Sequence, residues 1–201
     1  MHKPLAILLS SSDEIARLAK SFKQREHRRL PGEARASVAL LLRPLEAGLE
    51  LLVIRRAARV GDPWSGHMGL PGGRRDSGDG GDLQTAVRET REELGLDLES
   101  TAELLGSLDD IQASANGLVI DLVVSAFVFL VGASPSLRLN DEVAEALWVP
   151  ISVLGDGRCA MTHQVELRGT LRDLPGWDVG GRIIWGLTYR IVSNLLRQIG
   201  L

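Results

Sequence analysis

The chain has 201 residues, of which 44% are hydrophobic and 24% are charged, and its formal net charge is -3. This length suits one domain with a sizeable core, and the weak negative charge gives no general attraction for nucleic acid or an anionic membrane. Cys159 is the one cysteine, which excludes a disulfide framework within the chain and indicates a reducing compartment.

The N-terminal region predicts a helix that precedes the main domain. The apolar run at residues 5–9 is too short for a signal peptide, and no stretch of the chain approaches the roughly 18 apolar residues of a membrane span. Residues 13–29 place apolar side chains at helical spacing, end in a basic segment and meet a break at Pro31. We expect a cytoplasmic protein with a helical extension over residues 1–34 and one main domain over residues 35–201.

Apolar runs in the main domain predict an alternation of strands and helices. Continuous or alternating apolar patterns indicate strands at residues 35–43, 49–56, 102–111, 117–131 and 146–149, and a hairpin over 163–174. Residues 181–199 predict a final amphipathic helix, and Trp148 and Trp185 are expected in the core. These elements favour one α/β domain with a mixed sheet between helices.

A glycine-rich turn followed by a cluster of carboxylates is the most informative segment. The helix expected from Asp82 or Leu83 to Leu94, with Gly95 as its C-cap, places Glu89, Glu92 and Glu93 within an arc of about 100°. Crowded carboxylates repel one another unless a cation neutralises them, and Mg²⁺ prefers such oxygen ligands. The spacing is equally compatible with a solvated acidic helix face.

Three other motifs fail in this segment. No Gly-Lys-Ser/Thr ends the glycine run, which excludes a P-loop. An EF-hand loop that started at Asp76 would place ligand positions on Gly78, Gly80 and Val87. The glycine spacing and the acidic residues of the turn also exclude a Rossmann fingerprint.

The sequence RETREELGL, residues 88–96, resembles the core of the Nudix box, with Thr90 where an aliphatic residue is usual. The segment from Gly73 to Arg88 is one residue longer than in the commonest form of the box, and the usual mid-box glutamate is missing. This longer, aspartate-bearing form is similar to the coenzyme A pyrophosphatase branch. LLVIR at residues 51–55 and LPGG at residues 70–73 match the ends of a second signature of that branch, although Leu70 replaces phenylalanine.

Two further features complete the resemblance. The segment between LLVIR and LPGG is two residues longer than in the branch, so the insert GDPWSGHM at residues 61–68 is expected to shape the pocket differently. The C-terminal IIWGLTYRIVSNLL also looks like the final helix of the branch.

The resemblance implies a Nudix-type α/β/α sandwich that hydrolyses a diphosphate bond with Mg²⁺ or Mn²⁺. Glu89, Glu92 and Glu93 are then the expected metal ligands, and Arg88 orients them by ion pairing. One of the glutamates or a loop carboxylate serves as general base, with Glu142 as the candidate outside the box, unless it is a plain surface acid. The small-molecule nucleotide substrate expected first is coenzyme A or an acyl-CoA, cleaved to 3′,5′-ADP and (acyl-)4′-phosphopantetheine.

Substrate contacts are expected upstream of the helix. Gly72 and Gly73 allow the backbone to approach phosphate oxygens or to bend sharply. Arg55, Arg56 and Arg59 are candidates to meet an additional phosphate, such as the 3′-phosphate of coenzyme A, or are ordinary surface arginines.

Single residues give weaker signals. His67 and Trp64 lie in the loop before the glycines, where they either contact substrate or anchor the loop. Asp109 and Asp110 lie either near the site or in a turn. Nothing near Cys159 in the sequence marks a base that would activate it as a catalytic thiol.

Two competing hypotheses remain at the level of function. One keeps the reaction but takes ADP-ribose, a dinucleotide or a nucleoside triphosphate as substrate. The other is a Nudix-fold ligand sensor without catalysis, which has no need of metal ligands, whereas Arg88 and all three glutamates are present here. Dimerisation is frequent in the family that the sequence resembles, and the N-terminal or C-terminal helix is a candidate interface for a homodimer.

Overall fold

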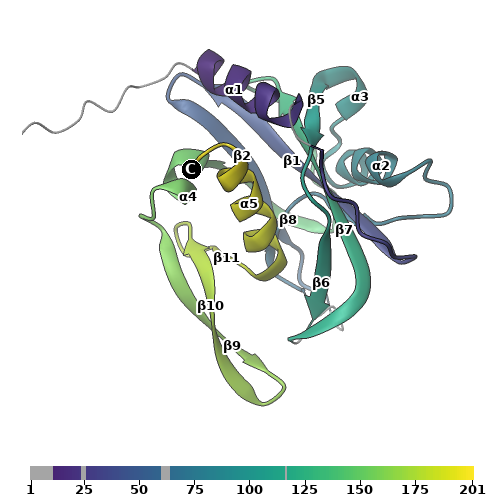
Figure 1. Cartoon of the computed structure of the whole chain (residues 1–201), viewed down its shortest axis with the longest axis vertical. Coiled ribbons are helices and arrows are strands. Elements are labelled where there is room, and N and C mark those ends of the chain that lie inside the picture. The colour runs from purple at the N-terminus through teal and green to yellow at the C-terminus, as the bar shows by residue number, and fades with distance from the viewer. Residues whose placement is uncertain (1–10, 24–25, 60–63, 116) are drawn as a thin grey trace, which may run out of the picture.

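A large mixed sheet and a small antiparallel sheet, with helices on both faces of the large sheet, make up the fold (Figure 1). The computed structural model describes residues 11–23, 26–59, 64–115 and 117–201. Two segments discussed above lie outside these ranges. They are the short apolar run at residues 5–9 and the first part of the GDPWSGHM insert, residues 61–63. Among the described residues, no helix combines the length and the apolar character needed to cross a membrane.

The strands and the helices are each numbered in chain order. The large sheet contains β1 (Arg35–Leu45), β2 (Gly48–Arg56), β3 (Met68–Gly69), β4 (Gly72–Arg74), β5 (Ala102–Ser107), β6 (Ile111–Ala115), β7 (Leu118–Val131) and β8 (Val143–Pro150). The small sheet contains β9 (Ala160–Leu167), β10 (Thr170–Asp178) and β11 (Ile183–Trp185). The helices are α1 (Ser11–Lys23), α2 (Asp82–Leu94), α3 (Leu98–Thr101), α4 (Ile151–Gly155) and α5 (Gly186–Gln198).

The large sheet runs in the order β3-β2-β1-β7-β5, and β1 and β7 are parallel while the other pairs are antiparallel. Outside this path, β4 pairs with β1, β6 with β7 and β8 with β2. The β1–β4 register places Gly72 opposite Val38 and Gly73 opposite Ser37. The glycine pair therefore lies beside the first half of β1, next to α2.

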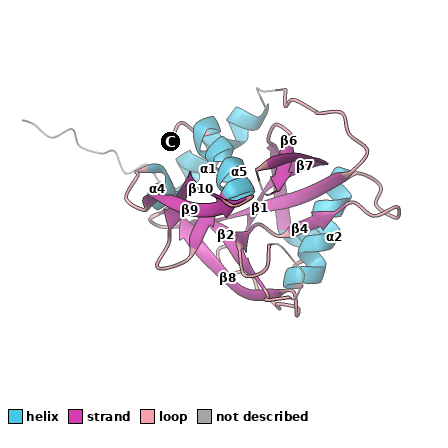
Figure 2. Cartoon of the chain, turned by 90° about the horizontal axis from the view of Figure 1, so that it is seen from below, coloured by secondary structure: helices cyan, strands magenta, loops and turns pink. Residues whose placement is uncertain are grey.

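The two faces of β1 pack against different layers (Figure 2). Leu40 and Leu42 belong to a cluster that includes residues of α1 and α5, whereas Ala39 and Leu41 belong to a cluster with α2. Successive side chains of a strand point to opposite faces, so a continuous apolar run is what a strand covered on both faces requires. The expected mixed sheet between helices is confirmed.

The helix of the glutamate cluster has the predicted bounds, Asp82–Leu94. Gly95 adopts the left-handed conformation (φ 64°), and its N–H donates to the carbonyl of Arg91. A residue without a Cβ adopts this φ without strain, which is why glycine ends the helix here.

Three predictions of element boundaries were wrong. The N-terminal helix ends at Lys23, and residues 26–30 are not helical, because the backbone of residues 28–30 instead hydrogen-bonds to the loop at Asp109 and Asp110. The final helix begins at Gly186, since residues 183–185 pair with β10. The strand expected at residues 102–111 ends at Ser107, and β6 begins at Ile111.

Candidate active site

The buried carboxylate of Glu93 is held by the glycine strand β4. The residue is 2% exposed, and its Oε2 accepts a hydrogen bond of 2.9 Å from the Gly72 N–H. Gly72 has a φ of 150°, and a Cβ on it would lie 2.2 Å from the carbonyl oxygen of Ser37. Only glycine therefore brings this N–H so close to β1 and to the carboxylate of Glu93.

Glu89 lies one turn earlier on α2, against the second glycine. A Cβ on Gly73 would lie 2.4 Å from the carboxyl carbon of Glu89, which is closer than any real contact. The absence of a side chain at Gly73 thus makes the space that the Glu89 carboxylate occupies. The predicted approach of the glycine pair to phosphate oxygens stays a prediction, and in the structure the pair lies against the carboxylates of the glutamate helix.

The three glutamates on one arc of α2 differ in burial. Glu93 is 2% exposed and Glu89 lines the pocket, whereas the side chain of Glu92 is 55% exposed, although Nη1 of Arg88 donates to both Glu89 (2.8 Å) and Glu92 (3.0 Å). An arc of about 100° is wide enough to reach from the buried edge of a helix into solvent. Glu142, from the loop before β8, completes the acidic group because it faces the same pocket.

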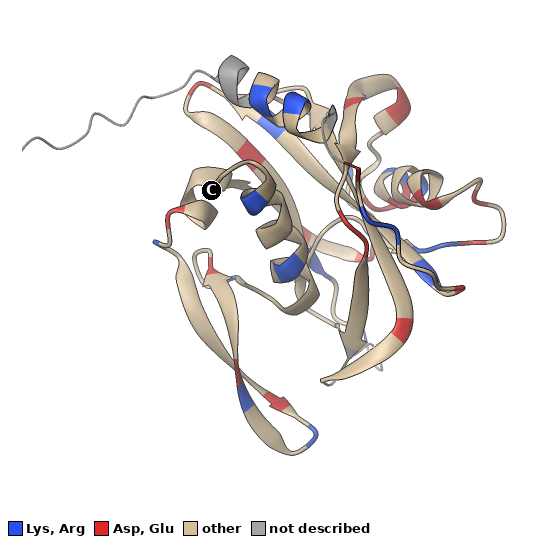
Figure 3. Ribbon diagram, in the orientation of Figure 1, with Lys and Arg blue, Asp and Glu red and all other residues tan. Residues whose placement is uncertain are grey.

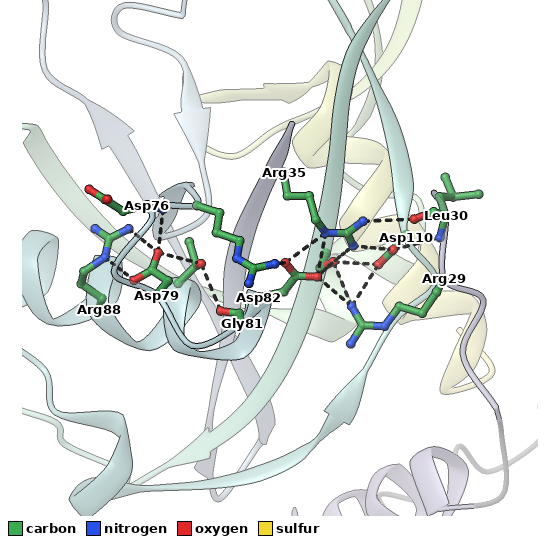
Figure 4. A network of polar contacts seen from close by, with 12 residues as sticks. Arg29, Leu30, Arg35, Asp76, Asp79, Gly81, Asp82, Arg88 and Asp110 are labelled. Atoms are coloured by element: carbon green, nitrogen blue, oxygen red, sulfur yellow. Dashed lines mark hydrogen bonds and ion pairs between the residues drawn. The ribbon is translucent and has the colours of Figure 1, made fainter. Parts of the chain in front are cut away.

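Arg88 joins the helix to the loop that precedes it (Figure 4). Residues of both charge signs colour the ribbon in this part of the molecule (Figure 3). Its guanidinium donates to Asp79, Glu89, Glu92 and the carbonyl of Arg74, with distances of 2.8 to 3.1 Å. Hydrogen bonds from Arg88 hold the pKa of Asp79 far below its usual value, and the same bonds raise the pKa of Arg88. The predicted orienting role of Arg88 agrees with these contacts.

Asp79 has a role that the sequence pattern did not indicate. It lies where the usual mid-box glutamate is missing, and it accepts from Arg88 and from the Thr85 hydroxyl. The available signal was an aspartate nine residues before the arginine, but a nine-residue separation across a loop carries no fixed geometry. The contact is set by the turn at residues 76–79.

The two inward glutamates carry a surplus of negative charge. Burial raises the pKa of Glu93 to about 7, and the neighbouring Glu89 and Glu142 add to the rise against the opposing Gly72 hydrogen bond. Burial also raises the pKa of Glu89, although the Arg88 guanidinium opposes the shift. Such crowding disfavours ionisation, and a bound cation would relieve it.

The acidic group fits a hard divalent cation in the chemistry of its donors. Glu89, Glu93 and Glu142 offer carboxylate oxygens, which Mg²⁺ and Mn²⁺ prefer. Within the described ranges, no three acidic, imidazole or thiol groups lie close enough to form a ready metal centre. Glu92, one of the three predicted ligands, is 55% exposed and is not among the residues that line the pocket, and its role as a ligand stays a prediction.

A pocket of about 780 Å³ opens at the acidic group. Its polar end includes Gly72, Gly73, Glu89, Glu93 and Glu142. Arg56 and Arg74 also line it and bring positive charge beside the carboxylates. This volume lies within the usual range for small-molecule sites.

The three upstream arginines are placed differently from one another. Arg56 lines the pocket, and its contact with substrate stays a prediction. Arg55 pairs with Glu145 at 3.2 Å, and Arg59 pairs with Glu142 at 3.0 Å. Arg55 and Arg59 are thus held by carboxylates of the β8 region and are not among the lining residues of the pocket.

Aromatic side chains form part of the pocket wall. Trp64 and His67 line the pocket, and the ring of His67 lies 5.1 Å from that of Trp185. The prediction of Trp185 as a core residue was wrong, because it is partly exposed and lines the pocket too. Trp148 is partly exposed, but it packs against the apolar cluster that includes α2, as predicted, and the guanidinium of Arg43 lies over its ring.

Asp110 and Cys159 belong to other parts of the molecule. Asp110 joins Arg35, Asp82 and Ser125 in a polar network at the start of α2 (Figure 4). Cys159 donates to the carbonyl of Val153, and burial raises the pKa of its thiol. Neither residue lines the pocket.

The comparison with family models identifies the class of protein. The NUDIX domain model matches residues 33–169, and the chain belongs to the Nudix hydrolase family. Members of this family act on diphosphate bonds of small-molecule nucleotides and generally use divalent metals.

Individual relatives resemble this chain over most of its length. The uncharacterized protein C14C4.10c of Schizosaccharomyces pombe is 41% identical over 156 residues, which cover 76% of this chain and 46% of that protein. The chain thus spans less than half the length of this relative. The human mitochondrial coenzyme A diphosphatase NUDT8 is 30% identical over 172 residues, which cover 83% of this chain and 70% of that protein.

A solved structure shows the same fold. The MutT/nudix family protein from Enterococcus faecalis superimposes with a TM-score of 0.52 and 17% identity, over 92% of this chain and 74% of that one. The predicted Nudix-type sandwich is therefore confirmed.

Proposed function

We propose that this protein hydrolyses the diphosphate bond of coenzyme A or an acyl-CoA with a divalent cation, giving 3′,5′-ADP and (acyl-)4′-phosphopantetheine. The observation that carries the proposal is the pair of inward carboxylates, Glu89 and Glu93, packed on the glycine strand at the polar end of the pocket. A buried surplus of carboxylates beside arginines fits the requirements of a metal-assisted phosphoryl reaction.

The proposal assigns tasks to four residues at or beside the polar end of the pocket. Glu89 and Glu93 hold the cation, which when bound neutralises phosphate charge and acidifies water. Arg88 fixes Glu89 relative to the loop through its contacts to Asp79 and the Arg74 carbonyl. Arg56 contributes positive charge for phosphate oxygens, and the general base is one of the pocket carboxylates.

Two observations support coenzyme A as the substrate. The sequence signature that ends in LPGG resembles that of the coenzyme A pyrophosphatase branch, and its glycines hold the glutamates here. One relative, human NUDT8, is named as a coenzyme A diphosphatase. The complete set of Arg88 and glutamate contacts argues against a ligand sensor without catalysis.

The test is hydrolysis by the purified chain with Mg²⁺ and, separately, Mn²⁺. Coenzyme A, ADP-ribose and diadenosine polyphosphates are compared at equal concentrations, and 3′,5′-ADP and 4′-phosphopantetheine are quantified by chromatography. We expect coenzyme A to give the highest kcat/KM. Turnover of ADP-ribose or dinucleotides in preference to coenzyme A would overturn the substrate assignment and leave the reaction intact.

A matched pair of variants tests the roles of the glutamates. Glu93→Gln is expected to lower kcat at least about a hundredfold, because it removes a carboxylate that holds the cation. Glu103→Gln, on the exposed side of β5, should leave kcat unchanged. Full activity of the Glu93→Gln variant would show that Glu93 is not a metal ligand.

A further inference from the structure

The loop before β8 presents Glu142 from a backbone that two other elements hold in place. The Asn140 N–H donates to the carbonyl of Glu93 at 3.0 Å, and the Ala57 N–H donates to the carbonyl of Glu142 at 2.7 Å. The side chain of Asn140 also accepts from the Glu142 N–H at 2.9 Å. The backbone of Glu142 is therefore fixed between the end of α2 and the end of β2, whereas its side chain is 41% exposed and has room to turn.

The carboxylate of Glu142 interacts with groups on both sides of the pocket edge. It lines the pocket, and its negative charge adds to the burial that raises the pKa of Glu93. At the same time, its Oε1 accepts a hydrogen bond of 3.0 Å from Nη1 of Arg59, which is not a lining residue. Glu142 thus belongs to the acidic group but is held by a guanidinium outside the pocket.

The three pocket carboxylates do not converge on one point. Glu89, Glu93 and Glu142 all line the pocket, yet no three acidic, imidazole or thiol groups of the described residues lie close enough to hold a metal ion together. Glu89 and Glu93 come from adjacent turns of one helix. Whether a third carboxylate joins them depends on which way the side chain of Glu142 points.

We propose that Arg59 is an internal counter-ion that keeps Glu142 away from the cation site, and that a divalent cation takes Glu142 from Arg59 when it binds. Arg59 is then a positioning residue, because it acts on the cation through Glu142. The inference rests on the proposed function in needing a divalent cation at Glu89 and Glu93. It does not depend on which diphosphate is the substrate.

The exchange is favourable because the Arg59–Glu142 pair is weak. The two side chains are 45% and 41% exposed, and solvent-exposed ion pairs contribute little to stability. Nη2 of Arg59 also lies 3.5 Å from Oδ2 of Asp141, so the guanidinium keeps a carboxylate partner when Glu142 leaves. A cation that gains a third carboxylate, by contrast, relieves the crowding of negative charge around Glu93.

The experiment measures the Kd of Mn²⁺ for the full chain without substrate, from the electron paramagnetic resonance of free Mn²⁺. Arg59→Gln is expected to bind Mn²⁺ about two- to fivefold more tightly than the wild type, because the cation no longer competes with the guanidinium. Arg55→Gln is the matched control, since Arg55 is equally exposed at 45% but pairs with Glu145. It should leave the Kd unchanged.

A double-mutant cycle separates this role from a general effect of charge. Glu142→Gln is expected to weaken Mn²⁺ binding, and Arg59→Gln should have no further effect in that background, because Arg59 acts through Glu142. Arg59→Lys should return the Kd close to that of the wild type, since an ammonium group still pairs with Glu142. Circular dichroism verifies that each variant is folded.

The outcomes separate this inference from the proposed function. Equal Kd values for the wild type and Arg59→Gln would overturn the inference, and so would an equal gain from Arg59→Gln with and without the Glu142 carboxylate. Either result leaves diphosphate hydrolysis intact. Failure of the wild type to bind Mn²⁺ or Mg²⁺ would overturn the inference and the proposed function together.

Discussion

At the scale of single residues, the site depends on carboxylates that touch backbone. Glu93 accepts from the Gly72 N–H, and Glu89 occupies the space where Gly73 lacks a side chain. Both glutamates come from α2, and both glycines come from β4. Besides any contact with phosphate, the two glycines therefore position the carboxylates of Glu89 and Glu93.

We predict that Gly73→Ala lowers kcat by at least about tenfold, because the new methyl group displaces the Glu89 carboxylate from its position. The measurement is steady-state hydrolysis together with the melting temperature. Gly78→Ala is the control, since no atom lies within 4 Å of a Cβ placed there. Equal kcat for wild type and Gly73→Ala would show that the position of Glu89 does not matter.

We also predict that Glu93→Gln stabilises the metal-free protein at pH 8. The folded pKa of Glu93, about 7, lies above its ordinary value of 4.5, so stability is lost as the pH rises from 4.5 to 7, where the unfolded chain ionises first, and the loss is complete above pH 7. The expected gain is about 2 kcal/mol in the free energy of unfolding at pH 8 and close to none below pH 4.5.

The measurement for this prediction is urea unfolding at pH 4.5 and 8 in the presence of a chelator. When Mg²⁺ replaces the chelator, it should stabilise the wild type more than the variant, since a ligand stabilises the state that binds it. Glu92→Gln serves as control because its side chain is 55% exposed. A variant no more stable than the wild type at pH 8 would contradict the burial argument.

At the scale of elements, α2 is anchored at both ends. Its last carbonyls, of Glu93 and Leu94, accept from the backbone N–H groups of Asn140 and Arg138. Near its start, Asp82 accepts from Arg35, which also contacts the buried Asp110. The backbone hydrogen bonds satisfy two of the carbonyl groups that a helix leaves free at its C-terminal end, and they connect α2 to the loop before β8. The Arg35–Asp82 contact connects the start of α2 to β1.

We predict that Asp110→Asn lowers the free energy of unfolding by about 3 kcal/mol at pH 7, because a buried ion pair loses one partner. Burial alone would raise the pKa of Asp110, but hydrogen bonds from Leu30, Arg35 and Ser125 outweigh it and hold the pKa below its usual value of 3.8. This stabilisation is therefore present above pH 3.8 and is lost as the pH falls through the lower folded pKa.

The difference between wild type and Asp110→Asn should thus shrink when unfolding is measured from pH 7 down to pH 2.5. Asp121→Asn, at an exposed position on β7, is the matched control and should leave stability unchanged. A constant difference across this pH range would show that the charge of Asp110 is not what stabilises the network.

At the scale of the whole molecule, the N-terminal helix belongs to the core. Leu18 and Phe22 of α1 are buried in the same cluster as residues of α5, and Phe22 packs on Gly106 of β5. The backbone of residues 28–30 also binds Asp109 and Asp110. The predicted division into an extension over residues 1–34 and a domain from residue 35 stays a prediction, but the packing joins both parts.

We predict that Leu18→Ala lowers the free energy of unfolding by about 2–4 kcal/mol, as expected for a leucine that is 2% exposed. Leu171→Ala, at a position that is 61% exposed, should change it by less than about 0.5 kcal/mol. Denaturant unfolding followed by tryptophan fluorescence measures both. A Leu18→Ala variant as stable as the wild type would show that α1 contributes little to the core.

The sequence by itself determined what depends on residues close together in the chain. The bounds of α2, its glycine cap and the long central strands follow from periodicity and local backbone preference, so they agreed with prediction. The family also followed from one contiguous motif. The end of α1 and the start of α5 did not follow from the sequence. The backbone after α1 hydrogen-bonds to Asp109, and the residues before α5 pair with β10, so residues distant in the sequence take the hydrogen bonds that a longer helix would form.

Only the tertiary structure decided what depends on residues far apart. It separated buried Glu93 from exposed Glu92, and it paired Arg88 with Asp79. It also brought the β9–β10 hairpin, about 75 residues beyond the glutamates, to the wall of their pocket. Helical periodicity places side chains on an arc around one helix, but the neighbouring strand decides which part of that arc is buried.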